Sequence, residues 1–464
     1  MPAHVITSEQ QRDRMLHTPI PRLILSLCLP TLATQLISVF YNTADTYFVS
    51  KLSTSASAAV GVVFSLMSII QAFGFGIGMG CGSIISRSLG GKDNDRADRI
   101  GSSAFVFAAA VGLALCAAGL CTLRPLMRLL GSTDTILPYA ESYARIILLA
   151  APIMCASFVL SNVLRAEGEA TLSMYGMCVG GLLNVGLDPL FIFAFHMGVR
   201  GAALATILSQ GVSCVWVCAF LRGKKTLLRL KNENIRLRPK FFLPCIALGA
   251  ASFIMQASES VISVCFNTSL LKYGGDIAVG AMTILTSVMQ FAMLPLQGLA
   301  QGAQPILSYN YGAKNAGRVR KAFQLLLISS LVYSTLLWSA IQIFPSVFAS
   351  IFTPNEELIV FAAKALRIYC GVLVLFGIQI ACQMTFVSLG NAPCSIIVAV
   401  VRKFVLLIPL IYIMPQLVSD QAMGVYMAEP VADVIAVTFT AILFSRQFRK
   451  SMTALELEAK NSDA

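Results

Sequence analysis

Acidic side chains lie inside several long apolar stretches of this sequence. Asp45 and Asp188 are the clearest cases, and each has a polar residue one helical turn before it, Tyr41 and Asn184 respectively. Residues four apart share one face of a helix. A charge at the centre of a bilayer costs about 2.5–3.5 kcal/mol, so such acids are expected to have a function or a partner.

Pro189 follows Asp188 directly, and a proline inside a helix frees a backbone carbonyl nearby. Carboxylate, amide and hydroxyl oxygens are ligands for a small hard cation, and a buried carboxylate can equally hold a proton. We therefore predict a cation or proton site formed by Asp45, Asn184, Asp188, Thr206 and Tyr41. If the cation is Na⁺, the predicted ligands are Asp45, Asn184, Asp188 and Thr206. The alternative is that each acid has a structural partner or faces solvent.

The second half of the chain offers another set of acids. Glu259 lies near Gln256 and Ser258, and Glu429 and Asp433 are four residues apart. Their charges and amides would suit a cationic ligand, although Glu429 and Asp433 could instead support helix packing. The candidate ligand-binding residues are Gln35, Gln256, Glu259, Met289, Gln290, Glu429 and Asp433.

Composition shows which elements must position these residues. The chain has 464 residues, of which 57% are hydrophobic and 12% are charged, and its mean hydropathy is +0.77. Soluble domains are about 25% charged, and a membrane-spanning helix needs about 20 apolar residues. We predict an all-α integral membrane protein with twelve transmembrane helices at 22–50, 57–88, 100–123, 137–163, 173–195, 200–221, 241–271, 276–309, 322–345, 357–388, 393–414 and 423–445.

Lysine and arginine set the orientation, because cytoplasmic loops carry an excess of both. With the N-terminus inside, twenty-four of the 34 basic residues fall on inside segments and five on outside segments. We expect a multi-pass protein of the cell membrane with both termini in the cytoplasm. The net charge of +12 is then a topology signal that favours contact with membrane lipids, and nucleic-acid binding has no support.

The two halves of the chain resemble each other at a nearly constant offset. Gly90-Gly91-Lys92 matches Gly312-Ala313-Lys314, and Arg145 matches Arg367, both at a spacing of 222. Six helices per repeat place both repeats in the same orientation, the parallel-repeat arrangement of secondary transporters. The predicted parts are a cytoplasmic segment (1–21), a six-helix lobe (22–221), a basic linker (222–240), a second six-helix lobe (241–445) and a cytoplasmic tail (446–464).

Several function classes find no support in the sequence. The longest loop, 222–240, is too short for a catalytic domain, and no GxxxxGK[ST] motif is present. We therefore expect no cofactor and no ATPase subunit. His4, His17 and His196 lie near segment ends rather than together in the membrane, so a membrane-embedded enzyme is disfavoured.

Six segments spread over the chain carry recognisable motifs: QLISVFYNTADTYFVSKL (35–52), LRAEGEA (164–170), NVGLDPLFI (184–192), GAALAT (201–206), PLQGLAQGAQPILSYNYGAKN (295–315) and GVYMAEPVAD (424–433). They resemble the MATE (multidrug and toxic compound extrusion) family, and the resemblance covers nearly the whole chain. The longest of them is similar to the bacterial MepA-like branch.

The resemblance implies two six-helix lobes in a V-shaped arrangement, exporting organic and often cationic compounds by antiport against Na⁺ or H⁺. It places the ion site of the first lobe on Asp45, Asn184, Asp188 and Thr206, with Tyr41 beside it, and a seventh-helix acid on Glu259. A tenth-helix acid found in one sodium-coupled branch has no counterpart between Leu366 and Leu389. We expect a monomer whose partners are small-molecule drugs. The alternative within the same superfamily is a flippase for lipids or lipid-linked oligosaccharides.

Overall fold

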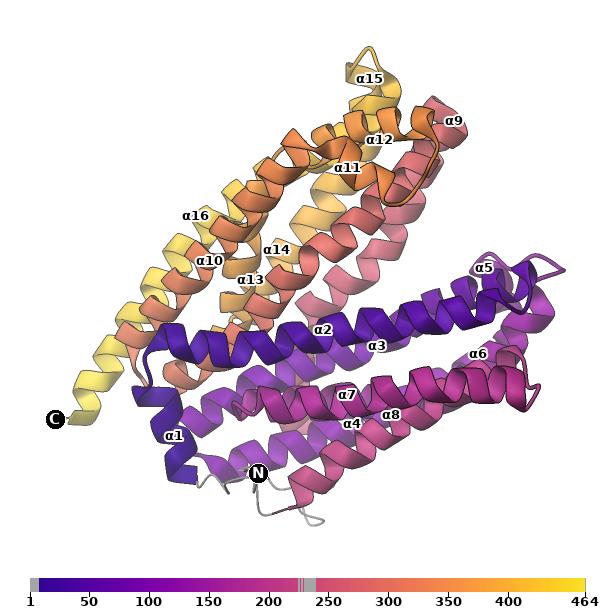
Figure 1. Cartoon of the computed structure of the whole chain (residues 1–464). Helices are drawn as coiled ribbons and strands as arrows, with labels where there is room; N and C mark the ends of the chain where they lie inside the picture. The colour runs from indigo at the N-terminus through magenta and orange to yellow at the C-terminus, as the bar shows by residue number, and fades with distance from the viewer. Residues whose placement is uncertain (1–7, 224–225, 227, 229–238, 464) are drawn as a thin grey trace. The chain divides into compact units, whose positions relative to one another are not determined.

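The computed structural model describes residues 8–223, 226, 228 and 239–463, and the regular structure in them is helical (Figure 1). The helices are α1 (Ser8–His17), α2 (Ile20–Ser50), α3 (Thr54–Gly90), α4 (Asn94–Cys121), α5 (Leu123–Leu129), α6 (Leu137–Ala166), α7 (Ala170–Pro189), η1 (Leu190–Ala194), α8 (Val199–Arg222), α9 (Pro239–Gly312), α10 (Ala316–Ile343), α11 (Pro345–Ser350), α12 (Glu356–Tyr369), η3 (Leu373–Leu375), α13 (Phe376–Leu389), α14 (Ala392–Val400), η4 (Val401–Leu407), α15 (Ile408–Leu417) and α16 (Gln421–Asp463).

Membrane-spanning segments dominate this list. Among the described residues, ten helices are long and apolar enough to cross a membrane, and α12 with η3–α13 forms an eleventh, bent by 50°. One of the ten, α9, has 74 residues and is broken at Gly275, where φ is +63°. Each arm of α9 exceeds the roughly 20 residues that a span requires. The described residues therefore contain the twelve spans that the sequence predicts.

Some predicted boundaries were wrong. The helix expected at 357–388 is interrupted at residues 370–375, where the α10 side chains of Trp338 and Ser334 donate hydrogen bonds to the carbonyls of Gly371 (2.8 Å) and Val374 (3.1 Å). These bonds satisfy backbone groups that the break leaves free. The helix expected at 423–445 continues as α16 as far as Asp463, and the cytoplasmic position expected for 446–464 stays a prediction.

The predicted repeat appears in the backbone of both halves. Lys92 and Lys314 both have positive φ, +65° and +58°, and Gly168 and Gly390 do as well, at +92° and +81°. The helices that follow the two lysines begin alike, since the side chains of Asp93 and Asn315 accept from the backbone three residues on. Equivalent left-handed turns and helix caps indicate that the two halves are structural repeats.

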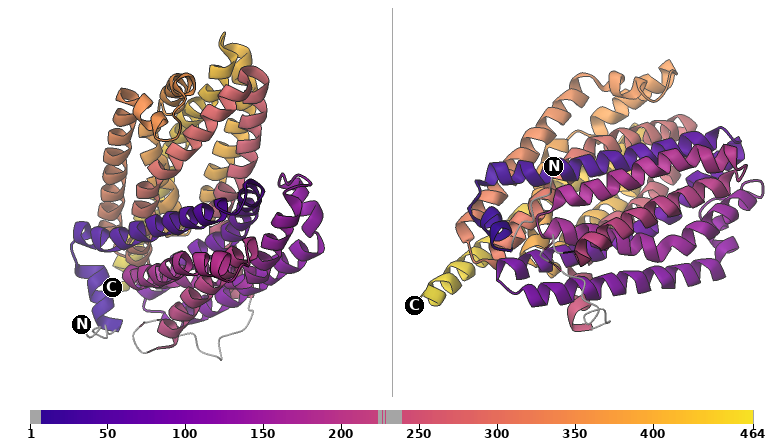
Figure 2. Two further views of the ribbon diagram at one scale, coloured as in Figure 1. Left: turned by 45° about the vertical axis from the view of Figure 1, so that its right-hand side comes forward. Right: turned by 60° about the horizontal axis from the view of Figure 1, so that its bottom comes forward.

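Residue contacts divide the chain into two compact units. Unit 1 comprises Met1–Phe253 and Ser308–Ala313, and unit 2 comprises Ile254–Leu307 and Lys314–Ala464. In unit 1, α6 packs against α3, α4 and α8, and α7 packs between α2 and α8; Figure 2 shows these helices from two further directions. A Cβ at Gly80 of α3 would overlap the carbonyl oxygen of Cys245, so glycine permits this close helix contact.

Most of the predicted linker 222–240 lies outside the described residues. One described residue of the segment is tied to unit 1, since the backbone N–H of Leu228 donates to Glu167 Oε1 at 3.1 Å.

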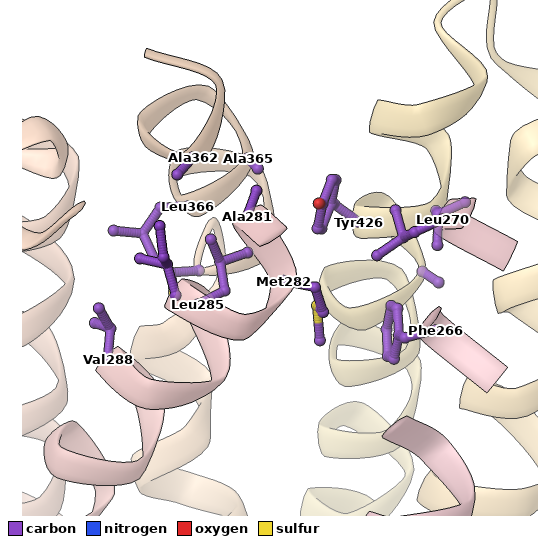
Figure 3. Packing of buried hydrophobic residues seen from close by; sticks show 14 of the residues in the cluster. Phe266, Leu270, Ala281, Met282, Leu285, Val288, Ala362, Ala365, Leu366 and Tyr426 are labelled. Atoms are coloured by element: carbon purple, nitrogen blue, oxygen red, sulfur yellow. The ribbon is translucent and has the colours of Figure 1, made fainter. Parts of the chain in front are cut away.

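Unit 2 is built around an apolar core formed by both arms of α9. Phe266 and Leu270 from the first arm and Ala281, Met282 and Leu285 from the second are among its residues (Figure 3). The buried Tyr426 of α16 belongs to the same core and donates a hydrogen bond to the carbonyl of Ala278 at 2.6 Å. This core fixes α9 against α12 and α16.

Candidate functional site

Four helices of unit 1 contribute the polar residues of the candidate ion site. Asp45 comes from α2, Tyr143 from α6, Asn184 and Asp188 from α7, and Thr206 from α8, and all five are buried. The hydroxyl of Tyr143 donates to Asp45 Oδ2 at 3.2 Å, and the same hydroxyl lies near that of Thr206. Asn184 Nδ2 donates to Thr206 Oγ1 at 3.4 Å. The site is therefore one connected group.

The two carboxylates belong to the same site, since Asp188 lies within electrostatic range of Asp45. In the described part of the chain, four oxygens here have no hydrogen-bond partner: Asp45 Oδ1, Asn184 Oδ1 and both carboxylate oxygens of Asp188. Buried polar atoms normally have partners. Two carboxylates and an amide with unused lone pairs, beside the Thr206 hydroxyl, suit a small hard cation or a shared proton.

The sequence of α7 explains how its acid reaches this position. At Gly180, a Cβ would overlap the hydroxyl of Ser213 on α8, and at Gly181 it would lie 3.1 Å from Ile37 of α2. Small residues thus let α7 approach both neighbours. Asp188 lies in the last turn before Pro189, and the chain continues as the π-helical segment η1. Such π segments often occur at functional sites because they change the direction of side chains.

Two further candidates from the sequence also lie on α2. Tyr41 is buried and accepts a hydrogen bond from Gln210 Nε2 of α8 at 3.4 Å. Gln35 is half-buried and lies ten residues before Asp45, about 15 Å along the helix axis. Tyr41 therefore borders the candidate ion site, whereas Gln35 lies well away from its carboxylates.

Unit 2 contains a cluster of charges within its spans. Arg402 of η4 binds both acids of α16, with Nε at 2.8 Å from Asp433 Oδ1 and Nη2 at 3.1 Å from Glu429 Oε1. Its guanidinium carbon lies 4.6 Å from the ring centroid of Phe376. Lys403 Nζ lies 2.7 Å from Glu259 Oε1 on α9. We call Arg402, Lys403, Glu259, Glu429 and Asp433 the charged cluster.

The other candidates in unit 2 lie on the two arms of α9. Gln256 and Gln290 are exposed, and Met289 packs against the apolar core. The substrate contacts predicted for them, and for the three acids, stay predictions.

Comparison with known proteins identifies the family. The family model MatE matches residues 30–190 and 251–413, which is more than half of the chain. The chain belongs to the MatE family. The matched MATE segments contain Asp45, Asn184, Asp188, Glu259 and Arg402, whereas Thr206 lies outside them.

Relatives agree with this membership. The MATE chain is 25% identical over 433 residues to the multidrug export protein MepA of Staphylococcus haemolyticus (strain JCSC1435), covering 93% of this chain and 95% of that protein. It is 26% identical to a solved MOP superfamily transporter from Pyrococcus furiosus Vc1, and the match covers 96% of this chain and 98% of that one, with a TM-score of 0.87. For that transporter, a reverse polarity of the binding pocket suggests a different function. A MATE crystal structure in the bent conformation is 24% identical, with coverage of 96% and 99% and a TM-score of 0.90, and shows the likeness of fold.

Three residues of the candidate ion site and the charged cluster were not predicted from the sequence. Tyr143 gives only a weak signal, because one tyrosine in an apolar helix is common. Arg402 and Lys403 give a stronger one, since two bases inside a predicted span require acidic partners. Which acids they bind depends on how α9, η4 and α16 pack together.

Proposed function

We propose that this MATE-family protein is a secondary active exporter of organic compounds, often cationic, driven by antiport against Na⁺ or H⁺. The observation that carries the proposal is the buried pair Asp45 and Asp188 with its unpartnered oxygens. The names of the MepA relatives, which are multidrug export proteins, support the substrate class.

Exchange at the acids of unit 1 supplies the coupling. A cation entering from outside neutralises Asp45 and Asp188, which changes the packing of α2 and releases the drug outward. Reopening towards the cytoplasm then releases the cation. Drug and ion therefore compete, directly or through the shape of the unit. Such coupling requires the two states to differ in affinity for each ligand.

Inverted vesicles with a fluorescent cationic dye in the surrounding medium, where the cytoplasmic face of the protein is exposed, test the proposal. A sodium gradient and a proton gradient are imposed separately, and the gradient that drives dye movement identifies the coupling ion. Vesicles without the protein measure leakage of the dye. If neither gradient moves dye faster than in those vesicles, the antiport proposal is wrong.

Asp45→Asn is the variant that tests the site. It keeps the size of the side chain and removes the negative charge, so we expect gradient-driven dye movement to fall at least tenfold. Asp134→Asn is the matched control, because Asp134 lies between α5 and α6 and its side chain is 90% exposed. Undiminished efflux by Asp45→Asn at equal membrane abundance would remove Asp45 from the mechanism.

The same proposal includes the membrane location and the oligomeric state of the protein. The protein acts as a monomer in the lipid of the cell membrane, with both termini in the cytoplasm and no ATPase subunit. A flippase for lipid-linked substrates is the alternative, and the acids of the candidate ion site argue against it. Movement of a fluorescent lipid-linked oligosaccharide in proteoliposomes, without any gradient-driven dye movement, would favour the flippase.

A further inference from the structure

Lys403 is a buried cation held by an exposed acid. Its side chain is 5% exposed, whereas that of Glu259 is 61% exposed, and Lys403 Nζ lies 2.7 Å from Glu259 Oε1. Exposed ion pairs contribute little to stability, and a buried ammonium is costly unless it is paired. Stability alone therefore does not explain why a buried lysine is paired with an exposed glutamate at this position.

The helix face around Glu259 is polar. Gln256, Glu259, Ser260, Ser263 and Asn267 are all exposed, and their spacing of three, four, seven and eleven residues places them on one side of the first arm of α9. Polar groups on a lipid-facing side would be costly. This face is therefore best explained as the lining of a water-accessible path, with Glu259 open to solutes that enter it.

The charged cluster has an imbalance of charge. When all five groups are ionised, three carboxylates face two cations. Arg402 is shared by Glu429 and Asp433, so the excess negative charge lies with these two buried acids. Lys403 also acts electrostatically on Glu429. The cluster would become neutral on gaining one positive charge.

We propose that Lys403 is a tethered competitor for a monovalent organic cation, and that Glu259 binds either the lysine ammonium or the cationic group of the substrate. This inference rests on the proposed export of organic cations. When substrate takes Glu259, Lys403 stays beside the excess negative charge of Glu429 and Asp433. The lysine thereby limits the affinity for substrate, which favours release.

Binding of ethidium, a monovalent aromatic cation, to the purified full chain in detergent tests this inference by fluorescence anisotropy. Lys403→Met removes the competitor, so we expect the Kd for ethidium to fall about tenfold. Glu259→Gln should raise the Kd by a similar factor, and the double variant should behave like Glu259→Gln alone. Lys364→Met is the matched control, because Lys364 is exposed and pairs with Asp420 outside the cluster; its Kd should equal that of the unchanged protein.

Several results would overturn the inference. An unchanged or weaker affinity in Lys403→Met would do so, and so would a gain that persists in the double variant. Thermal unfolding and size-exclusion profiles verify folding, and Lys403→Gln replaces Lys403→Met if that variant does not fold. If the unchanged protein moves dye in vesicles but Lys403→Met shows no gain, only the competitor role is wrong. If the unchanged protein neither binds nor moves any cationic dye, the proposed function fails with it.

Discussion

Removing Arg402 should strongly destabilise unit 2. Its side chain is 3% exposed, and those of its partners Glu429 and Asp433 are 11% and 8% exposed. Arg402→Met keeps a long side chain that can still contact Phe376, but it leaves two buried carboxylates without their shared cation. Loss of one partner of a buried ion pair costs about 3–5 kcal/mol.

The expected shift in unfolding temperature follows from the size of the unit. Unit 2 contains about 200 residues, and each kcal/mol shifts the midpoint of a domain of this size by about 2–4 °C. We therefore expect the apparent midpoint of Arg402→Met in detergent to fall by roughly 6–20 °C. Thermal unfolding followed by tryptophan fluorescence suits the measurement, because Trp338 lies in unit 2 and its indole N–H is bonded to Gly371.

Two further variants make the measurement decisive. Lys364→Met breaks an ion pair whose side chains are 61% and 47% exposed, so it should cost less than about 1 kcal/mol. Arg402→Met combined with Glu429→Gln and Asp433→Asn should recover most of the lost stability, because the uncompensated charges are gone. If the unfolding midpoint of Arg402→Met falls no further than that of Lys364→Met, the reasoning is refuted.

Three other predictions concern packing, pH and the ion site. Gly80→Ala should lower stability by about 1–3 kcal/mol, because its Cβ overlaps the Cys245 carbonyl; Gly211→Ala, with open space around it, should be neutral in the same unfolding assay. Hydrogen bonds from Lys364 and from the Met423 backbone hold the pKa of Asp420 below its ordinary 3.8, so the stability from this exposed pair is present above pH 3.8 and is lost as the pH falls through the lower folded value. Asp420→Asn should therefore reduce the stability that is lost between neutral and acid pH, by less than about 1 kcal/mol in total. An unchanged loss of stability on the acid side would contradict this assignment. Asp188→Asn should lower gradient-driven dye efflux at least tenfold at equal abundance, and efflux at the normal rate would exclude Asp188 from coupling.

The candidate ion site was largely predictable because its signals are local. Asp45 and Asp188 stand out as acids in apolar helices, and Tyr41 and Asn184 lie one turn away on the same faces. Grouping α2 with α7 and α8 rested on the chemistry of these residues and on the family resemblance, since periodicity within one helix carries no information about its neighbours. Tyr143 was missed because 98 residues separate it from Asp45, and only the packing of α6 brings the two together.

The acids of unit 2 show the opposite case. The sequence identified Glu259, Glu429 and Asp433, but not that Arg402 and Lys403 of one π-helical segment would bind them. A π segment changes the angular spacing of side chains, so consecutive residues can reach different helices in a way that regular periodicity does not predict. The break between α12 and α13 was missed for a related reason, because hydrogen bonds from α10 stabilise it.

The sequence by itself determined the number of spans, the repeat and the buried acids, because hydropathy and charge act on each segment independently of its neighbours. The tertiary structure alone decided which acids keep unpaired oxygens and which are paired with the protein's own bases. That distinction depends on how the helices rotate and pack, and no single segment encodes it.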